Sequence, residues 1–134
     1  MKLIVCLDDQ NGMLFHGRRQ SRDKVLCENI LDTFGNAGLY MNAYSAKLFP
    51  ANENEIHIGD DLSAKISGYW FVENLDMLPY ADRITELVVY RWNRVYPADL
   101  YFPIEVVLKR LKLTQSRTFE GNSHPRITEE IYKL

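Results

Sequence analysis

The chain has 134 residues, of which 46% are hydrophobic and 25% are charged, and its formal net charge is −2. This composition excludes a disordered chain, and the length fits one domain, residues 1–134, with a single core. The near-neutral charge gives no electrostatic reason to expect a nucleic acid or an anionic membrane as a partner. No apolar run approaches the roughly 20 residues of a membrane-spanning helix.

The N-terminal segment and the two cysteines indicate a cytoplasmic protein. The segment MKLIVCL is short and is followed at once by Asp8 and Asp9, unlike a secretory signal peptide. Cys6 lies in an apolar run and Cys27 in a helical pattern, without the C-x-x-C spacing of a metal or redox site. We therefore expect two small buried thiols in a reduced protein.

Strands and helices alternate in the first half of the chain. Helical spacing predicts a helix at residues 21–34 with Ser21 as its N-cap, and Asn42 is expected to cap a short helix at 42–49. Residues 15–20, FHGRRQ, are expected to form an exposed basic loop. Apolar runs predict buried strands at residues 2–7 and 38–41, and further strands are expected at residues 55–59 and 69–73.

Strands dominate the second half. Residues 84–95 alternate in polarity and are rich in β-branched and aromatic side chains, as in a long strand. Residues 110–120 and 126–134 predict two further strands, joined by the turn GNSHP. The predicted architecture is an α/β fold with a mostly parallel central sheet that ends in an antiparallel C-terminal hairpin.

In such a sheet, a ligand site lies outside the carboxyl ends of the parallel strands. The basic loop with Arg18, Arg19 and Arg22 should hang over that edge, where guanidinium groups would bind a small anion. The alternative is a solvated loop whose arginines pair with local acids. The polar residues expected at the strand ends are Asp8, Asp9, Asn42, Tyr44, Ser45, Glu73 and Asn74.

Four segments, in order, resemble dihydrofolate reductases and together span nearly the whole chain. MKLIVCLDDQNGMLF is similar to that family's first strand and following loop, and GLYMNAYSAKLF to its VIMGRKTYES segment. YWFVENLDMLPYADRITELVVYRWNRVYPADLYFP is similar to its strand, LPxAD and GDTxFP pattern, and LKLTQSRTFEGNSHPRITEEIYKL to its closing hairpin. The resemblance implies that family's three-layer α/β fold.

The residues that bind NADPH in that family are replaced in this chain. The family's Gly-Gly pair, which lets the pyrophosphate approach a helix N-terminus, becomes Glu73-Asn74, and only ENLDM remains before LPYAD. The family's GRKT positions become residues 42–45, without the Arg and Lys that meet the cofactor phosphates. We therefore expect no NADPH and no other cofactor, because a carboxylate at Glu73 would repel a pyrophosphate.

Two functions follow from the resemblance. One is a divergent NADPH-dependent reductase of a pterin-like substrate, in which Asp23 matches the catalytic acidic residue near the start of the family's first helix. The alternative role of Asp23 is an exposed first-turn carboxylate that favours the helix dipole. The other function, which we favour, is that of a domain without an intact NADPH site that binds a small polar or anionic ligand, or a protein partner. The residues expected to bind it are Arg18, Arg19, Arg22, Asn42, Tyr44, Ser45, Glu73 and Asn74.

The segments RRQSRD and WNRVYPAD also resemble short bacterial proteins labelled ribonuclease Z. A zinc hydrolase of that kind needs clustered ligands such as H-x-H-x-D-H, whereas His16, His57 and His124 are far apart in the sequence. We expect no metal site, a structural role for His57, and solvated loop positions for His16 and His124. No Ser or Cys lies in a G-x-S-x-G elbow, so we expect no nucleophilic catalysis. The sequence does not indicate an oligomeric state.

Overall fold

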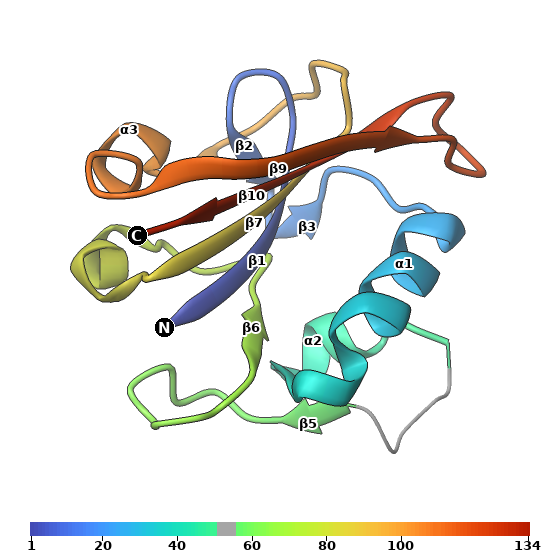
Figure 1. The fold of residues 1–134 in the computed structure, drawn as a ribbon. Coiled ribbons are helices and arrows are strands. Elements are labelled where there is room, and N and C mark those ends of the chain that lie inside the picture. The colour runs from blue at the N-terminus through green and yellow to red at the C-terminus, as the bar shows by residue number, and fades with distance from the viewer. Residues whose placement is uncertain (51–55) are drawn as a thin grey trace.

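The computed structural model of the protein describes residues 1–50 and 56–134. Its centre is a sheet with the strand order β5-β4-β6-β1-β7-β10-β9 (Figure 1). The first five strands in this order pair in parallel, whereas β10 runs antiparallel to both β7 and β9, as predicted. The strands are β1 (Lys2–Leu7), β4 (Leu39–Met41), β5 (Ile56–Ile58), β6 (Tyr69–Phe71), β7 (Glu86–Arg91), β9 (Lys112–Phe119) and β10 (Ile127–Lys133).

The central strands are apolar on both faces because a layer covers each side of the sheet. In β1, Leu3 and Val5 pack into one apolar cluster, and Ile4 packs into the other. Strand β7 alternates in the same way at Val88 and Val89. All five side chains are fully buried, so the sheet forms the middle of three layers.

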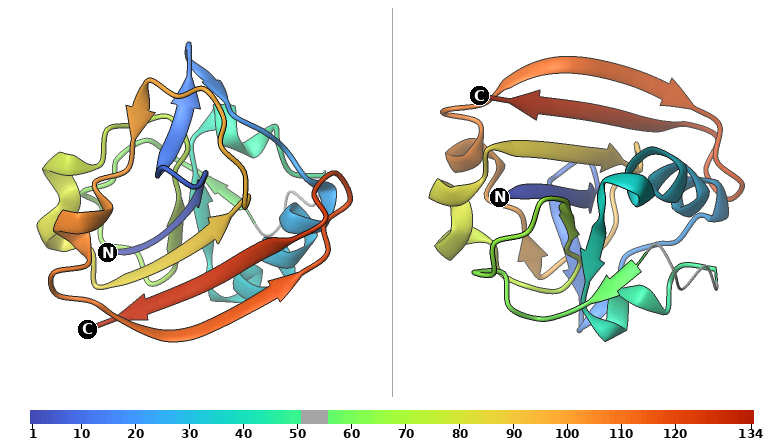
Figure 2. Two further views of the ribbon diagram at one scale, coloured as in Figure 1. Left: turned by 90° about the horizontal axis from the view of Figure 1, so that it is seen from above. Right: turned by 60° about the horizontal axis from the view of Figure 1, so that its bottom comes forward.

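Two helices cover one face of the sheet (Figure 2). They are α1 (Lys24–Phe34) and α2 (Ala43–Ala46), and a short 3-10 helix, η1 (Gly35–Ala37), follows α1. Helix α1 packs Leu26 and Ile30 against this face, at the helical spacing that the sequence predicted.

Helix α1 begins later than predicted. Its N-cap is Asp23, not Ser21, because the Asp23 carboxylate accepts hydrogen bonds from the N–H groups of Val25 and Leu26 at 3.0 and 3.2 Å. An N-cap needs a side-chain oxygen that reaches the first free N–H groups of the helix. Asp23 is therefore a buried cap, which corrects its expected position as an exposed first-turn residue.

The opposite face is covered by a small antiparallel sheet, β3-β2-β8, and by two short helices (Figure 2). Residues 15–20 were expected as a loop, but residues 15–19 belong to a β-hairpin. Its turn residues His16 and Gly17 have φ values of 50° and 73°, and a two-residue type I′ turn requires positive φ at both positions. The elements of this layer are β2 (Gly12–Phe15), β3 (Arg18–Arg19), β8 (Leu100–Tyr101), η3 (Leu78–Arg83) and α3 (Ile104–Val107).

Several elements are shorter than predicted. The strand expected over 84–95 ends at Arg91, before Asn93 with its φ of 60°. The helix expected over 42–49 is α2, capped as predicted by Asn42, whose side chain accepts from the Ser45 N–H at 2.9 Å. The strand expected over 55–59 is β5. The first residue of the expected range, Glu55, lies outside the described residues. In the part of the chain that the structure describes, no helix is both long and apolar enough to span a bilayer.

Candidate functional site

A buried carboxylate lies at the carboxyl end of β6. Glu73 is 7% exposed, and its two carboxylate oxygens accept from Arg19: Nε to Oε2 at 2.9 Å and Nη2 to Oε1 at 3.0 Å. Ser45 Oγ, in α2, also donates to Oε1, at 2.8 Å. The hydrogen bond to Glu73 raises the pKa of Arg19. We call these three residues and Tyr44 the Arg19–Glu73 cluster.

Tyr44 completes the cluster from the side of α2. The Arg19 guanidinium carbon lies 4.4 Å from the centre of the Tyr44 ring, a cation–π contact. The Arg19 backbone N–H donates to the Tyr44 hydroxyl oxygen at 3.0 Å. Beside the cluster, Asn42 Nδ2 donates to Asn74 Oδ1 at 2.9 Å. The structure thus brings together six of the predicted ligand-binding residues, but their polar groups are largely used by one another.

The chain after β6 forms no helix that points at this edge. Residues 73–75 form a bend, residues 76 and 77 have no regular structure, and the next helical segment is η3, which begins at Leu78. The shortened connection expected from the sequence is therefore present. A cleft of about 240 Å³ adjoins the strand ends and is lined by Asn42, Gly59, Asp60, Leu62, Trp70, Phe71, Val72, Asn74 and Leu75.

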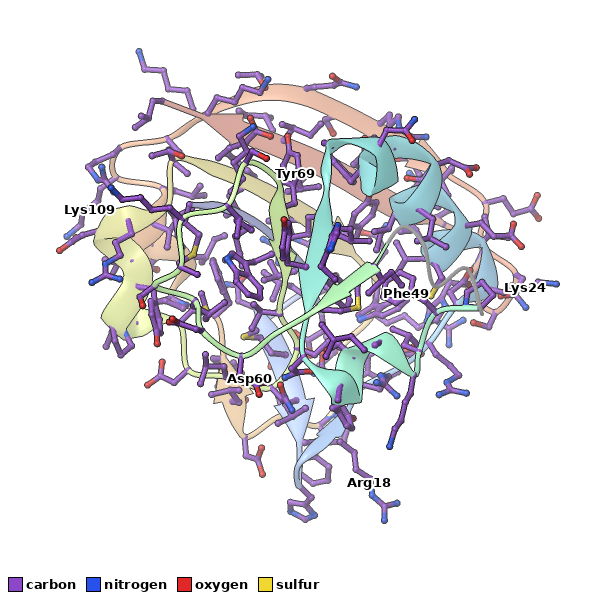
Figure 3. All side chains as sticks on the ribbon, turned by 90° about the horizontal axis from the view of Figure 1, so that it is seen from below. Arg18, Lys24, Phe49, Asp60, Tyr69 and Lys109 are labelled. Carbon is purple, nitrogen blue, oxygen red and sulfur yellow. The ribbon has the colours of Figure 1, made fainter. Side chains whose placement is uncertain are left out.

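A larger cleft of about 510 Å³ lies beside the β2–β3 hairpin, lined by Phe15, His16, Arg18, Arg19, Gln20, Tyr96 and Pro97. The rings of Phe15 and His16 stack with their centroids 3.8 Å apart. Arg18 is exposed, and Figure 3 shows its side chain at the end of the hairpin, directed away from the body of the molecule. We call this feature the hairpin cleft.

Asp8, which directly follows β1, forms hydrogen bonds to two residues that line the hairpin cleft, Gln20 and Tyr96. Its Oδ2 accepts from Gln20 Nε2 and from the Tyr96 N–H, both at 3.1 Å. Its Oδ1 accepts from the N–H groups of Gln10 and Gly12, both at 2.8 Å. The Asp8 carboxylate therefore fixes the turn that follows β1 and also joins segments 88 residues apart.

Asp23 is the centre of a second buried network. The carboxylate, 2% exposed, accepts from its own helix and from the turn between β9 and β10. Oδ1 accepts from the Asn122 N–H at 3.1 Å, and Oδ2 accepts from the N–H groups of Ser123 and His124 at 2.9 and 3.2 Å. Burial alone would raise the pKa of Asp23. Hydrogen bonds from the backbone of Ser123, Asn122 and Leu26 and from the side chain of His124 instead hold the pKa well below its usual value.

His124 was expected to be a solvated loop residue, and this expectation is wrong. The residue is 3% exposed, and its ring stacks on Trp92 with the centroids 4.6 Å apart. Nδ1 lies 3.1 Å from Asp23 Oδ2, and Nε2 lies 3.1 Å from Ser21 Oγ and 2.9 Å from the Tyr96 hydroxyl. No local pattern in the sequence could reveal this network, because its members lie up to 103 residues apart.

The remaining candidates stand apart from these networks. Arg22 is exposed and lines a third cleft, of about 290 Å³, with Lys24 and Phe49. Cys6 and Cys27 are free thiols, and burial raises the pKa of Cys27 to about 12. Within residues 1–50 and 56–134, no three His, Cys, Asp or Glu side chains are grouped so that they could hold a metal ion.

The three layers, the parallel sheet and the antiparallel C-terminal hairpin define a dihydrofolate-reductase-like α/β domain. A dihydrofolate reductase from Enterococcus faecalis, solved in complex with NADP(H) and RAB-propyl, superposes with a TM-score of 0.71, over 98% of this chain and 94% of that chain. No family model and no curated protein matches the sequence. The identity to the solved structure is 9%, so the likeness establishes the fold, and the function must be argued from the site.

Proposed function

We propose that the protein is a dihydrofolate-reductase-like domain that has lost the dinucleotide site and binds a small anionic ligand in the hairpin cleft. The observation that carries this proposal is the Arg19–Glu73 cluster. It puts a buried carboxylate at the carboxyl end of β6, and it uses the nearest guanidinium to neutralise that carboxylate.

The cluster disfavours a dinucleotide for two reasons. A pyrophosphate at the end of β6 would approach Glu73, and freeing Arg19 to receive it would break a largely buried bidentate ion pair, at a cost of about 3–5 kcal/mol. The N–H groups of a helix N-terminus, which bind phosphates well, are also missing from residues 73–77.

The hairpin cleft suits a smaller anion. Among the ion pairs formed by the described residues, none includes Arg18, so its charge is available to a ligand carboxylate or phosphate. The stacked rings of Phe15 and His16, and the ring of Tyr96 that also lines the cleft, offer faces on which a planar group can stack. The ligand class that fits best is therefore a small planar carboxylate or phosphate.

The contacts of Asp23 favour this proposal over a divergent reductase. A catalytic carboxylate needs an oxygen that reaches the substrate. Both oxygens of Asp23 instead accept several hydrogen bonds from within the protein, including five from backbone N–H groups. Asp23 therefore supports a structural role in the folded domain.

A thermal-shift screen of small carboxylates, phosphates and neutral analogues tests the anionic ligand. A ligand at 100 times its Kd stabilises the folded state by about 2.7 kcal/mol, and Arg18→Ala should remove this shift. Lys109→Ala is the control, because Lys109 is exposed on the far side of the molecule (Figure 3). Stabilisation by neutral or cationic compounds only, or an equal loss in both variants, would contradict the proposal.

Calorimetric titration with NADPH tests the loss of the dinucleotide site. We expect no measurable binding heat at micromolar concentrations. A Kd below about 10 μM, equivalent to roughly −7 kcal/mol, would show that the site survives in spite of Glu73.

A further inference from the structure

Three side chains form a hydrogen-bonded relay at the N-terminus of α1. His124 Nδ1 lies 3.1 Å from Asp23 Oδ2, and His124 Nε2 lies 3.1 Å from Ser21 Oγ. Ser123 Oγ also lies 3.0 Å from Nδ1. In the tautomer in which Nδ1–H donates to the carboxylate, the lone pair of Nε2 faces the serine hydroxyl. This is the order of contacts by which a histidine takes the proton of a nucleophilic serine.

The relay is rigid at its base and open at its serine. Asp23 and His124 are both almost fully buried, and the His124 backbone N–H also donates to Asp23, at 3.2 Å. Stacking on Trp92 fixes the plane of the imidazole. Ser21 is only half-buried, so its hydroxyl is the member of the relay that a substrate can reach.

Tyr96 supplies a second hydroxyl at the same point. It lies 2.9 Å from His124 Nε2 and 3.5 Å from Ser21 Oγ. Neutral Nε2 has one lone pair, so only one of the two hydroxyls can donate to it at a time. When Ser21 donates to Nε2, the Tyr96 O–H can donate weakly to Ser21 Oγ, 3.5 Å away, or can turn to the oxygen of a bound carbonyl, which is the role of an oxyanion-hole donor.

The relay adjoins the hairpin cleft. Gln20, directly before Ser21 in the chain, and Tyr96 both line that cleft. The Tyr96 hydroxyl lies 3.5 Å from Ser21 Oγ, so a ligand that extends from the cleft past Tyr96 would bring a carbonyl group towards Ser21. A nucleophile (Ser21), a base (His124) and an oxyanion donor (Tyr96) therefore lie beside a cleft that Arg18 makes positive.

We propose that Ser21 and His124 are catalytic residues of a metal-independent esterase, with Asp23 as the positioning residue of His124. The substrate class is a small carboxylic ester that carries a separate anionic group, and this choice of substrate rests on the proposed function of the hairpin cleft. Ser21 Oγ attacks the ester carbonyl carbon while its proton passes to His124 Nε2. The C–O bond to the leaving alcohol then breaks, and the alcohol takes that proton. Water attacks the acyl-Ser21, gives one proton through Nε2 to Ser21 Oγ, and releases the carboxylic acid.

The test uses the full chain with two chromogenic esters of similar length, the anionic 4-nitrophenyl hemisuccinate and the neutral 4-nitrophenyl butyrate. A fluorophosphonate reagent, followed by peptide mass spectrometry, locates any activated serine. Ser21→Ala should lower kcat/KM by at least about 100-fold and abolish the adduct. Ser116→Ala is the matched control, since Ser116 is exposed on β9, and it should change neither readout.

A third variant separates the oxyanion role from the relay. Tyr96→Phe should lower kcat for both esters by about 100-fold or more while KM changes little, and the fluorophosphonate should still label Ser21. A structural role for Tyr96 would instead alter the melting temperature and leave kcat of the folded enzyme unchanged.

The outcomes distinguish this inference from the proposed function. Turnover in the parent equal to that of Ser21→Ala, or no adduct on Ser21, overturns the esterase even if anions bind in the hairpin cleft. Turnover that requires Ser21 but shows no preference for the anionic ester supports the relay and contradicts the anionic ligand. Turnover that requires Ser21 and prefers the anionic ester by 10-fold or more supports both.

Discussion

Replacing Asp23 by Asn tests the network that joins α1 to the β9–β10 turn. The amide keeps one oxygen but places an NH₂ group where the other oxygen was. If the NH₂ replaces Oδ2, it faces the N–H groups of Ser123 and His124, which then have no acceptor. If it replaces Oδ1, it faces the N–H groups of Val25, Leu26 and Asn122.

Neither orientation of the amide satisfies all of these donors. Each buried donor that loses its acceptor costs about 1–3 kcal/mol, so we expect Asp23→Asn to lower the free energy of unfolding by about 3–5 kcal/mol. This exceeds the roughly 0.3–1 kcal/mol of a solvent-exposed charge that acts only on the helix dipole. Because the carboxylate is buried, 1 M salt should change the cost little.

Urea denaturation of parent and variant measures this difference, with Asp32→Asn, an exposed position in the same helix, as the control. The control should change stability by no more than about 0.5 kcal/mol. The folded-state pKa of Asp23 lies below its unfolded value, so its stabilisation is fully present above about pH 5 and is lost as the pH falls through the unfolded and then the folded pKa. A cost for Asp23→Asn below about 1 kcal/mol, or one that high salt removes, would refute the reasoning.

Three further variants or reactions probe other parts of the structure. Glu73→Gln should lower the free energy of unfolding by about 2–3 kcal/mol in urea, because it removes the charge that pairs with Arg19; an unchanged midpoint would mean that the pair contributes nothing. Gly121→Ala should destabilise by about 1–3 kcal/mol, since the new Cβ would meet the Asp23 carboxylate and lie 2.8 Å from Ile127 Cδ1; a melting temperature equal to that of the parent would contradict this packing. Burial raises the pKa of Cys27 to about 12, so a thiol reagent at pH 8 should react with it only after unfolding; rapid reaction of the native protein would show that this thiol is accessible.

The architecture could be predicted because it depends on local patterns. The apolar run of β1 and the alternation of β7 indicate strands buried on both faces, and the two C-terminal segments around GNSHP read as a hairpin. The sheet rule also placed Glu73 and the arginines at one edge, where Arg19 does lie. The rule could not predict the ion pair between Arg19 and Glu73, because it states where strand ends meet and not which side chains bind one another.

The hydrogen-bond network around Asp23 and His124 could not be predicted from the sequence, for a different reason. Ser21 and His124 become neighbours only because α1 begins beside the turn between β9 and β10 (Figure 1). That proximity depends on the complete strand order, in which β10 inserts between β7 and β9. The hairpin at residues 15–18 was missed although its His-Gly turn was visible, because two arginines after the turn suggested a solvated loop.

The hydrogen bonds from the β9–β10 turn to Asp23, the N-cap of α1, have a consequence for the protein during its synthesis. The N–H groups that complete the surroundings of Asp23 belong to residues 99–101 positions later. At about 5–20 residues per second, a ribosome adds them roughly 5–20 s after Asp23. Throughout that interval the Asp23 carboxylate lacks most of its final hydrogen-bond donors, and β7 lacks its antiparallel partner strand β10. Native packing at this corner therefore forms late, only after residues 122–124 have been added.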